Sequence, residues 1–282
     1  LCICLRRAKQ CLATLLADDI FVSFIHCHVS SQWPNILGVD VACIAIAWQL
    51  VFAGATGKSV GWAAIIVLGL SVWLTYMADR LFDAGKRPLA SLQSFRHRFA
   101  KEYRIPIWRF WYLLFITNLC LSTQLSGPQF RRGLLLLGIC LLYTFLNQKL
   151  SRRFFPKEVC VALIFTGGVV VFIPTPIPPG TCLSFAMICL LNCLIIGARE
   201  KEIDAEMDVH SIAPLLSEGF LLTIAVVSGV TLLFVSQQFQ FAMAVYAFLL
   251  GGMHYLRRLM SIEDFRVLAD AALLIGAVFA HL

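Results

Sequence analysis

Four stretches of this chain contain no Asp, Glu, Lys or Arg, and each is long enough to cross a lipid bilayer at least once. They are residues 59–78, 110–130, 159–198 and 219–256. Only 14% of the 282 residues are charged, against about a quarter in a soluble domain. The short alternating segments of a membrane barrel do not occur in the sequence. The sequence therefore predicts an all-α, polytopic membrane protein.

About nine transmembrane helices can be drawn along the chain. Closely spaced prolines at 174–180 cannot continue a helix, so they divide the longest apolar stretch into two spans. The expected spans are residues 36–57, 59–78, 105–126, 131–148, 157–174, 181–198, 214–235, 239–256 and 266–282. We interpret residues 1–35 as an amphipathic lead-in and residues 36–282 as one membrane domain.

The basic residues are distributed unequally between the two sides of these spans. Of the 23 Lys and Arg, 19 lie in the N-terminal segment and in the loops after the even-numbered spans, and only three lie in the other loops. The positive-inside rule then places the N-terminus and the even-numbered loops in the cytoplasm. The net charge of +7 follows from this bias, so it gives no reason to expect nucleic-acid binding.

Two acidic clusters follow the second and sixth expected spans, both on the predicted cytoplasmic side. They are Asp79-Arg-Leu-Phe-Asp83 and, 125 residues later, Asp204-Ala-Glu-Met-Asp208. On a helix, carboxylates four residues apart lie on one face and repel each other. Mg²⁺ would offset the repulsion, since it binds through one or two carboxylates and takes phosphate oxygens as further ligands. The clusters therefore predict a magnesium–diphosphate site at a membrane surface.

Basic residues beside the clusters are candidates for binding the diphosphate. They are Lys86 and Arg87 after the first cluster, and Arg199 and Lys201 before the second. Such cations would neutralise the charge that grows on a leaving pyrophosphate. The 22 Phe, 6 Trp and 6 Tyr could stabilise an allylic carbocation, although membrane proteins also use aromatic residues for packing.

In these features the sequence resembles the UbiA-type intramembrane prenyltransferases, over roughly residues 36–282. That family has nine spans and two aspartate motifs, after the second and sixth spans, on one membrane face. Asp79 and Asp83 match the aspartates of its first motif, Asn-x-x-x-Asp-x-x-x-Asp, and Thr75 stands at the Asn position. Asp204 and Asp208 match the second motif, Asp-x-x-x-Asp.

The resemblance carries further expectations about fold and function. It implies a ring of helices around a central cavity, capped by the loops 80–104 and 199–213. It also implies magnesium-dependent transfer of a prenyl group from a prenyl diphosphate to a lipophilic acceptor, for example an aromatic one, within the membrane. Lys157 matches a basic residue that contacts diphosphate in the family. The expected location is a bacterial inner membrane, with the active site facing the cytoplasm.

Three other interpretations of the same residues stay open. A secondary transporter would explain the similar halves and the Pro and Gly breaks, although the carboxylates lie at the ends of spans and not at the bilayer midplane. A family member that has lost catalysis and binds lipid would explain Thr75 at the Asn position. Finally, the four aspartates could be solvated loop charges that balance nearby Lys and Arg.

Overall fold

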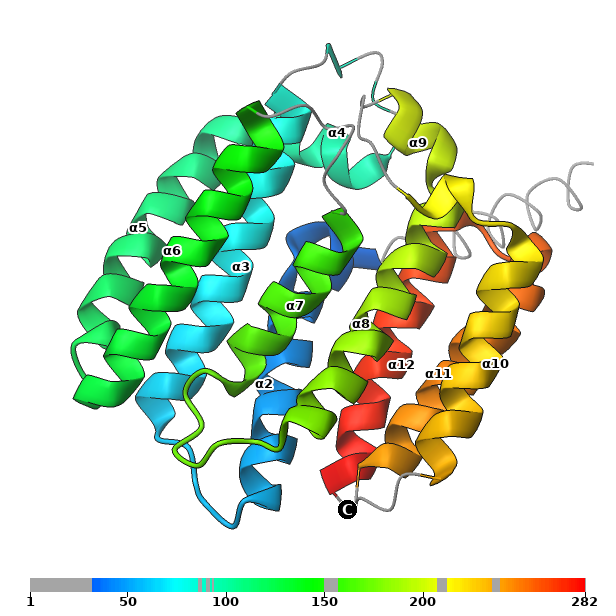
Figure 1. The fold of residues 1–282 in the computed structure, drawn as a ribbon. Coiled ribbons are helices and arrows are strands. Elements are labelled where there is room, and N and C mark those ends of the chain that lie inside the picture. The colour runs from blue at the N-terminus through cyan, green and yellow to red at the C-terminus, as the bar shows by residue number, and fades with distance from the viewer. Residues whose placement is uncertain are drawn as a thin grey trace, which may run out of the picture.

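A computed structural model describes residues 32–85, 88–89, 92, 94–149, 157–206, 212–234 and 239–281. Every regular element in these residues is a helix, which confirms the all-α class (Figure 1). The predicted lead-in, residues 1–35, lies almost wholly outside the described part of the chain. The extent of the two predicted regions therefore stays a prediction.

The helices come in two sizes. The long ones are α2 (Val39–Ala55), α3 (Trp62–Gly85), α5 (Arg104–Ser122), α6 (Gly127–Lys149), α7 (Lys157–Val170), α8 (Pro179–Arg199), α10 (Glu218–Phe234), α11 (Gln240–Tyr255) and α12 (Ile262–His281). The short ones are α4 (Phe95–Glu102), α9 (Lys201–Glu206) and the 3₁₀ turns η2 (Ala213–Leu215) and η3 (Arg257–Leu259). The prolines at 174–179 separate α7 from α8, as predicted, and Pro179 begins α8, where its missing N–H costs nothing.

Consecutive long helices run in alternating directions, so their connections fall at two opposite ends of the bundle (Figure 1). The connections α3–α5, α6–α7, α8–α10 and α11–α12 share one end, at the top of Figure 1, with the short helices α4 and α9. We call this the basic end, because these are the connections in which the sequence concentrates Lys and Arg. Both predicted cap loops therefore belong to the same end of the protein.

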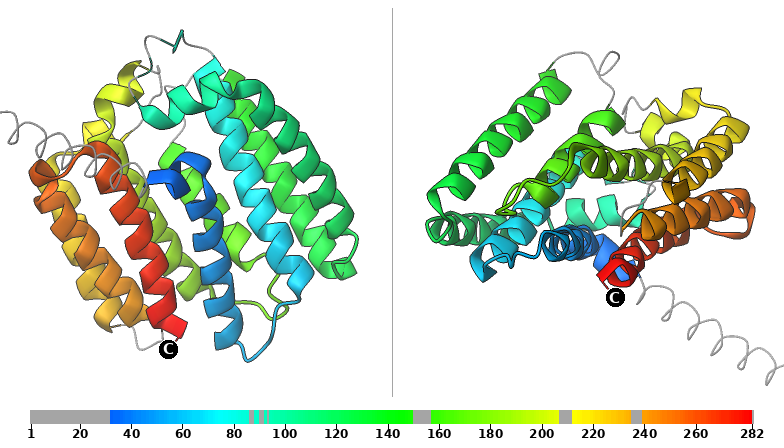
Figure 2. Two further views of the ribbon diagram at one scale, coloured as in Figure 1. Left: turned by 180° about the vertical axis from the view of Figure 1, so that it is seen from behind. Right: turned by 60° about the horizontal axis from the view of Figure 1, so that its bottom comes forward.

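The helix neighbours form a closed arrangement, because the last helix packs against the first. α12 contacts α2, and α2 contacts α3, which contacts α5. On the other side α6 contacts α7, α7 contacts α8, and α8 contacts α10 and α11 (Figure 2). α2 also touches α7, and α12 touches α8, so helices meet across the middle of the bundle. The central cavity expected from the resemblance stays a prediction.

Aromatic side chains fill the region between α2 and α8, beside α12. Trp48 lies 4.8 Å from Phe185 between ring centroids, and Phe52 lies 5.2 Å from Phe185. All three are fully buried, and the Trp48 indole donates a hydrogen bond of 3.1 Å to the Leu273 carbonyl of α12. This packing joins the first and last helices through side-chain shape, the main source of helix association inside a bilayer.

Within the described part of the chain, four helices are long and apolar enough to cross a membrane: α3, α5, residues 127–146 of α6, and α8. α5 has no buried residue, and some of its apolar side chains, such as Leu113 and Ile116, are more than half exposed. An apolar surface of this kind suits contact with lipid tails and not with water. The chain is therefore an integral membrane protein, while the number of nine crossings stays a prediction.

The structure differs from the sequence prediction at the ends of spans two and six. We expected the first aspartate cluster in a loop after residue 78, but α3 continues to Gly85 and carries both aspartates. Residues 79–84 contain only helix-compatible side chains, so the charges end the apolar run without ending the helix. The expected loops 80–104 and 199–213 also contain the unpredicted helices α4 and α9.

Candidate functional site

The first aspartate pair occupies the last two turns of α3, at the basic end. Asp79 and Asp83 are both partly buried, and their spacing of four residues places them on one face of the helix. Thr75 lies one turn earlier on the same face and is exposed. Its hydroxyl donates a hydrogen bond of 2.8 Å to the Ser71 carbonyl, so the hydroxyl proton is already used within the helix.

The second aspartate pair follows α8 at the same end. Asp204 lies on α9, where the structure describes the backbone but not the side chain. Asp208 falls outside the described residues, as do Lys86 and Arg87. The convergence of four carboxylates on one metal cluster therefore stays a prediction.

A small hydrophobic cluster joins the segments that carry the two motifs. It contains residues of α3, of α4 and the segment before it, and of α9, namely Met77, Leu81, Ala84, Leu92, Ala100 and Ile203. Leu81 lies between Asp79 and Asp83, and Ile203 directly precedes Asp204. Each of these six side chains is less than 9% exposed. Segments more than 100 residues apart in sequence are thus packed together at the basic end.

Lys157, the residue matched to a diphosphate ligand, begins α7 at the same end of the bundle. Its charge is close enough to act on His97 of α4. The next residue, Glu158, is buried, and its Oε1 accepts a 3.0 Å hydrogen bond from the backbone N–H of Ile212, just after the second motif. Asp79 and Glu158 both lie within electrostatic range of Tyr143 on α6, so α3, α6 and α7 contribute polar groups to one region.

The two basic residues beside the second motif differ in their surroundings. Arg199, the last residue of α8, donates a 2.7 Å hydrogen bond to the Met260 carbonyl, in the connection before α12. Lys201 is exposed on α9. Arg199 thus links the end of α8 to the segment before α12 in this structure. Its role in diphosphate binding stays a prediction.

Arg80, between the two aspartates of the first motif, is buried and points away from them toward α2. Its Nη1 donates hydrogen bonds of 2.7 Å to the carbonyls of Asn35 and Ile36, where the helical turn before α2 ends. The guanidinium carbon lies 4.3 Å from the centroid of the Tyr76 ring. A cation favours the carbonyl end of a helix, so Arg80 holds the start of α2 against α3.

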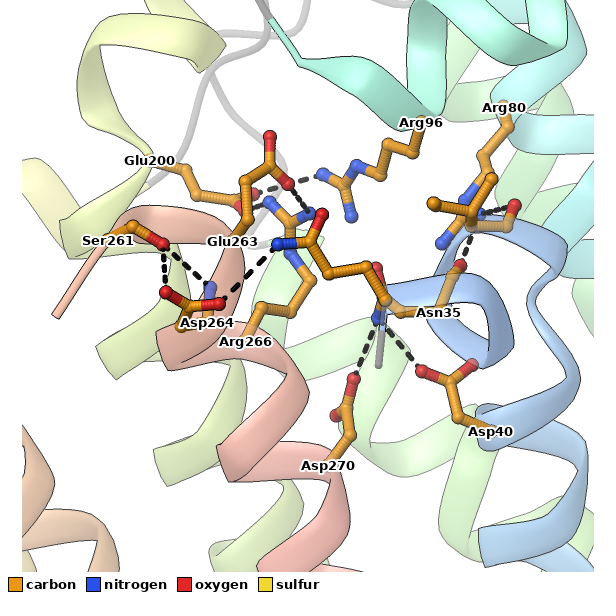
Figure 3. A network of polar contacts seen from close by, with 12 residues as sticks. Asn35, Asp40, Arg80, Arg96, Glu200, Ser261, Glu263, Asp264, Arg266 and Asp270 are labelled. Atoms are coloured by element: carbon orange, nitrogen blue, oxygen red, sulfur yellow. Dashed lines mark hydrogen bonds and ion pairs between the residues drawn. The ribbon is translucent and has the colours of Figure 1, made fainter. Parts of the chain in front are cut away.

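Asn35 connects two carboxylates from opposite ends of the sequence (Figure 3). Its Nδ2 donates to Oδ2 of Asp40 on α2 at 2.8 Å and to Oδ2 of Asp270 on α12 at 3.1 Å. Asp270 is 8% exposed. The hydrogen bonds help to offset the cost of burying its carboxylate inside an apolar helix.

His97, on α4, is surrounded by positive charge. Burial lowers the pKa of its imidazole, and Arg96, Arg80, Arg266 and Lys157 lower it further, to about 2. The imidazole is therefore neutral at physiological pH. A protonated His97 would add a fifth positive charge to these four. Its low pKa therefore reflects both burial and the strongly positive environment beneath α4.

The described part of the site offers two carboxylates for a metal ion. Asp79 and Asp83 supply oxygen ligands one helical turn apart, the hard donors that Mg²⁺ prefers. Within the described residues no group of three or more His, Cys, Asp or Glu could hold a metal. Because Mg²⁺ needs only one or two protein carboxylates when phosphate supplies other ligands, this donor set fits a magnesium ion that arrives with a diphosphate.

Comparison with known proteins gives one informative result. No protein-family model and no curated protein sequence matches the chain. The structure is similar to the apo structure of a UbiA homolog from Aeropyrum pernix K1, with a TM-score of 0.55 and 14% sequence identity. The match covers 86% of this chain and 99% of that one. The resemblance to the UbiA-type family is therefore confirmed for the fold.

The sequence places Arg80, Arg96 and Glu200 in the predicted cap loops, but their partners, and those of Arg266, were not predicted. One signal was available for Arg266 and for Asp270, because ionisable residues within an apolar span usually have partners in the bundle interior. Arg96 and Glu200 gave no such signal, since their pairing depends on residues 104 positions apart.

Proposed function

We propose that this protein transfers a prenyl group from a prenyl diphosphate to a lipophilic acceptor inside the membrane, with Mg²⁺ as cofactor. The observation that carries the proposal is the packing of α3 and α9 into one hydrophobic cluster, since it brings both aspartate segments to the same end. The UbiA-like fold supports it, because the two aspartate motifs follow the second and sixth spans as in that family. Prenyl diphosphate, acceptor and surrounding lipid are the proposed partners.

The aspartates would hold Mg²⁺, which supplies positive charge that binds the diphosphate and stabilises it as a leaving group. In the reaction the bond between the allylic carbon and the diphosphate oxygen breaks, and both electrons leave with pyrophosphate. A nucleophilic atom of the acceptor bonds to the allylic carbon, and the acceptor then loses a proton. Lys157, at the start of α7, would bind phosphate oxygens directly, and the apolar bundle would keep water from the carbocation.

We place this site on the cytoplasmic face of a bacterial inner membrane. The support is the positive-inside rule, because the basic end carries most of the Lys and Arg together with the first motif and α9. Labelling of single cysteines with a membrane-impermeant reagent, at the exposed positions Arg98 and Glu202, would test this orientation. Reaction from the outer side of intact cells would contradict it.

A second candidate function follows from Thr75. The side chain at the Asn position has no carbonyl oxygen, and its hydroxyl proton is engaged by Ser71. A protein with a weaker metal site could bind prenyl diphosphates without transferring them. Binding without turnover would favour this candidate.

The experiment is a transfer assay on the purified protein in lipid nanodiscs. The protein is incubated with Mg²⁺, a panel of radiolabelled prenyl diphosphates and a total lipid extract as acceptor source, and products are identified by mass. We expect a prenylated lipid product and equimolar pyrophosphate, both lost when EDTA removes Mg²⁺. Absence of product with every donor, while labelled diphosphate still binds, would replace the transferase with the binding candidate.

A further inference from the structure

Glu200 occupies the junction between α8 and the short helix that carries Asp204. Its backbone N–H donates to the Ile196 carbonyl and so completes the last turn of α8, and α9 begins at the next residue. Glu200 is nevertheless 5% exposed, although it carries a carboxylate. A buried carboxylate is unfavourable unless its oxygens have strong partners.

Two arginines from other parts of the chain provide those partners (Figure 3). Oε2 of Glu200 accepts a hydrogen bond of 3.1 Å from Nη2 of Arg96, on α4. Oε1 forms an ion pair with Nη2 of Arg266, on α12. All three side chains are between 3% and 13% exposed. We call these residues the Arg–Glu–Arg triad.

The triad joins three elements that have no covalent connection near this point. α4 belongs to the segment that follows the first aspartate motif, α9 carries part of the second, and α12 is fixed to α2. Burial makes the link strong, because removing the Glu200 carboxylate would leave the guanidinium groups of Arg96 and Arg266 with only Glu263 nearby, 3.8 Å from Arg266 and 30% exposed. Both carboxylate oxygens of Glu200 face arginines, so this residue is poorly placed to bind a cation itself.

We infer that Glu200 and Arg96 are positioning residues that set the distance between the two aspartate segments. This inference rests on the proposed function. Ile203 already packs α9 against α3 and α4, but apolar contacts tolerate sliding. The ion pair between Arg96 and Glu200 fixes the direction of α9, and therefore where Asp204 stands relative to Asp79 and Asp83. Substitution of residues that orient metal ligands in this way typically lowers metal affinity or activity about 10- to 100-fold.

The first test measures, without any substrate, how firmly the Arg–Glu–Arg triad holds α4 and α9 at a fixed distance. Genetically encoded spin labels at two exposed positions, Arg98 on α4 and Glu202 on α9, report the distance between the helices by pulsed electron resonance. We expect a narrow distance distribution in the otherwise unchanged protein and a clearly broader one in Arg96→Gln. Arg96→Gln is the main variant because it leaves Glu200 paired with Arg266 and so keeps the buried charges balanced. Glu200→Gln should broaden the distribution further.

The matched control is Glu218→Gln. Glu218 pairs with Arg257 at the same end of the protein, but this pair joins the start of α10 to the turn after α11 and touches neither motif segment. We expect the α4–α9 distance distribution to stay narrow in this variant. An unchanged distribution in Arg96→Gln, or equal broadening in Glu218→Gln, would overturn the inference.

The second test separates positioning from general stability. Mn²⁺ binding is measured in the presence of inorganic pyrophosphate, a probe that needs no turnover. We expect Arg96→Gln to weaken Mn²⁺ binding about ten-fold, and Glu218→Gln to leave it unchanged. Equal Mn²⁺ affinity in wild type and Arg96→Gln would overturn the positioning role. If the wild type binds no Mn²⁺ with pyrophosphate, the proposed function itself fails, while the distance measurement still decides whether the triad is a tether.

Discussion

The middle of the bundle and its basic end are held together by different forces. In the middle, Trp48, Phe52 and Phe185 interlock as buried rings, and shape alone decides the fit. At the basic end, buried charges such as Glu200 and Arg266 are paired with charges of opposite sign. The protein thus uses apolar packing for its frame and directional polar contacts at the end that carries the two aspartate segments.

Substitution of an aspartate at the basic end should reduce prenyl transfer strongly while changing the stability of the fold little. Replacing Asp83 with Asn removes a proposed metal ligand while keeping the size of the side chain. We expect kcat/KM for prenyl transfer to fall at least about 1,000-fold, or about 4 kcal/mol of transition-state stabilisation. The melting temperature in the absence of Mg²⁺ should not fall, because the repulsion with Asp79 is also removed.

The control for this prediction is Glu102→Gln. Glu102 is an exposed carboxylate on α4 at the same end, outside the proposed site. Its substitution should leave kcat/KM and the Mg²⁺ requirement within about two-fold of wild type. Full activity of Asp83→Asn would mean that the first motif does not hold the metal.

In the middle of the bundle we expect the opposite result, a loss of stability with an unchanged rate of prenyl transfer. Phe185→Ala removes a fully buried ring that contacts both Trp48 and Phe52. The cavity should destabilise the protein by about 3 kcal/mol, which thermal unfolding in detergent would detect. The protein that remains folded should keep its prenyl-transfer rate, measured per folded molecule. A large loss of rate without a loss of stability would show that the ring cluster belongs to the site.

Lys157 should show a third pattern, in which substrate binding changes but metal dependence does not. Lys157→Ala removes a cation proposed to bind phosphate oxygens directly. We expect KM for the prenyl diphosphate to rise about ten-fold, with an unchanged Mg²⁺ concentration for half-maximal activity. A changed Mg²⁺ requirement with an unchanged KM would place Lys157 with the metal ligands instead.

His97 should make the stability of the basic end depend on pH. The pKa of its imidazole is lowered to about 2 in the folded protein. In the unfolded chain the pKa of the same imidazole is about 6.5. Below about pH 6.5 the unfolded chain therefore binds a proton that the folded protein does not, and stability falls as the pH falls, by up to about 1.4 kcal/mol per pH unit. In His97→Asn the melting temperature should depend less on pH between 5 and 6.5. An unchanged slope would contradict burial of a neutral imidazole.

The sequence predicted the frame better than the site. Runs without charge gave the helical class, and the clustered prolines correctly separated α7 from α8. α3 was predicted too short, because charged residues end an apolar run without ending a helix. The joining of α9 and α3 in one hydrophobic cluster could not be predicted from spacing, because Ile203 and Leu81 look like ordinary apolar residues in polar segments. Long-range pairing of this kind depends on the tertiary fold and leaves no local pattern.

The proposed function requires that the segments carried by α3 and α9 form one metal–diphosphate site. A structure of the protein with Mg²⁺ and a non-ionising prenyl thiodiphosphate would test this claim directly. We predict that metal ions bridge the diphosphate to Asp79 or Asp83 on one side and to Asp204 or Asp208 on the other. The prenyl chain should extend from there into the apolar bundle. A diphosphate bound elsewhere, or metal ions held by one aspartate pair alone, would contradict the account.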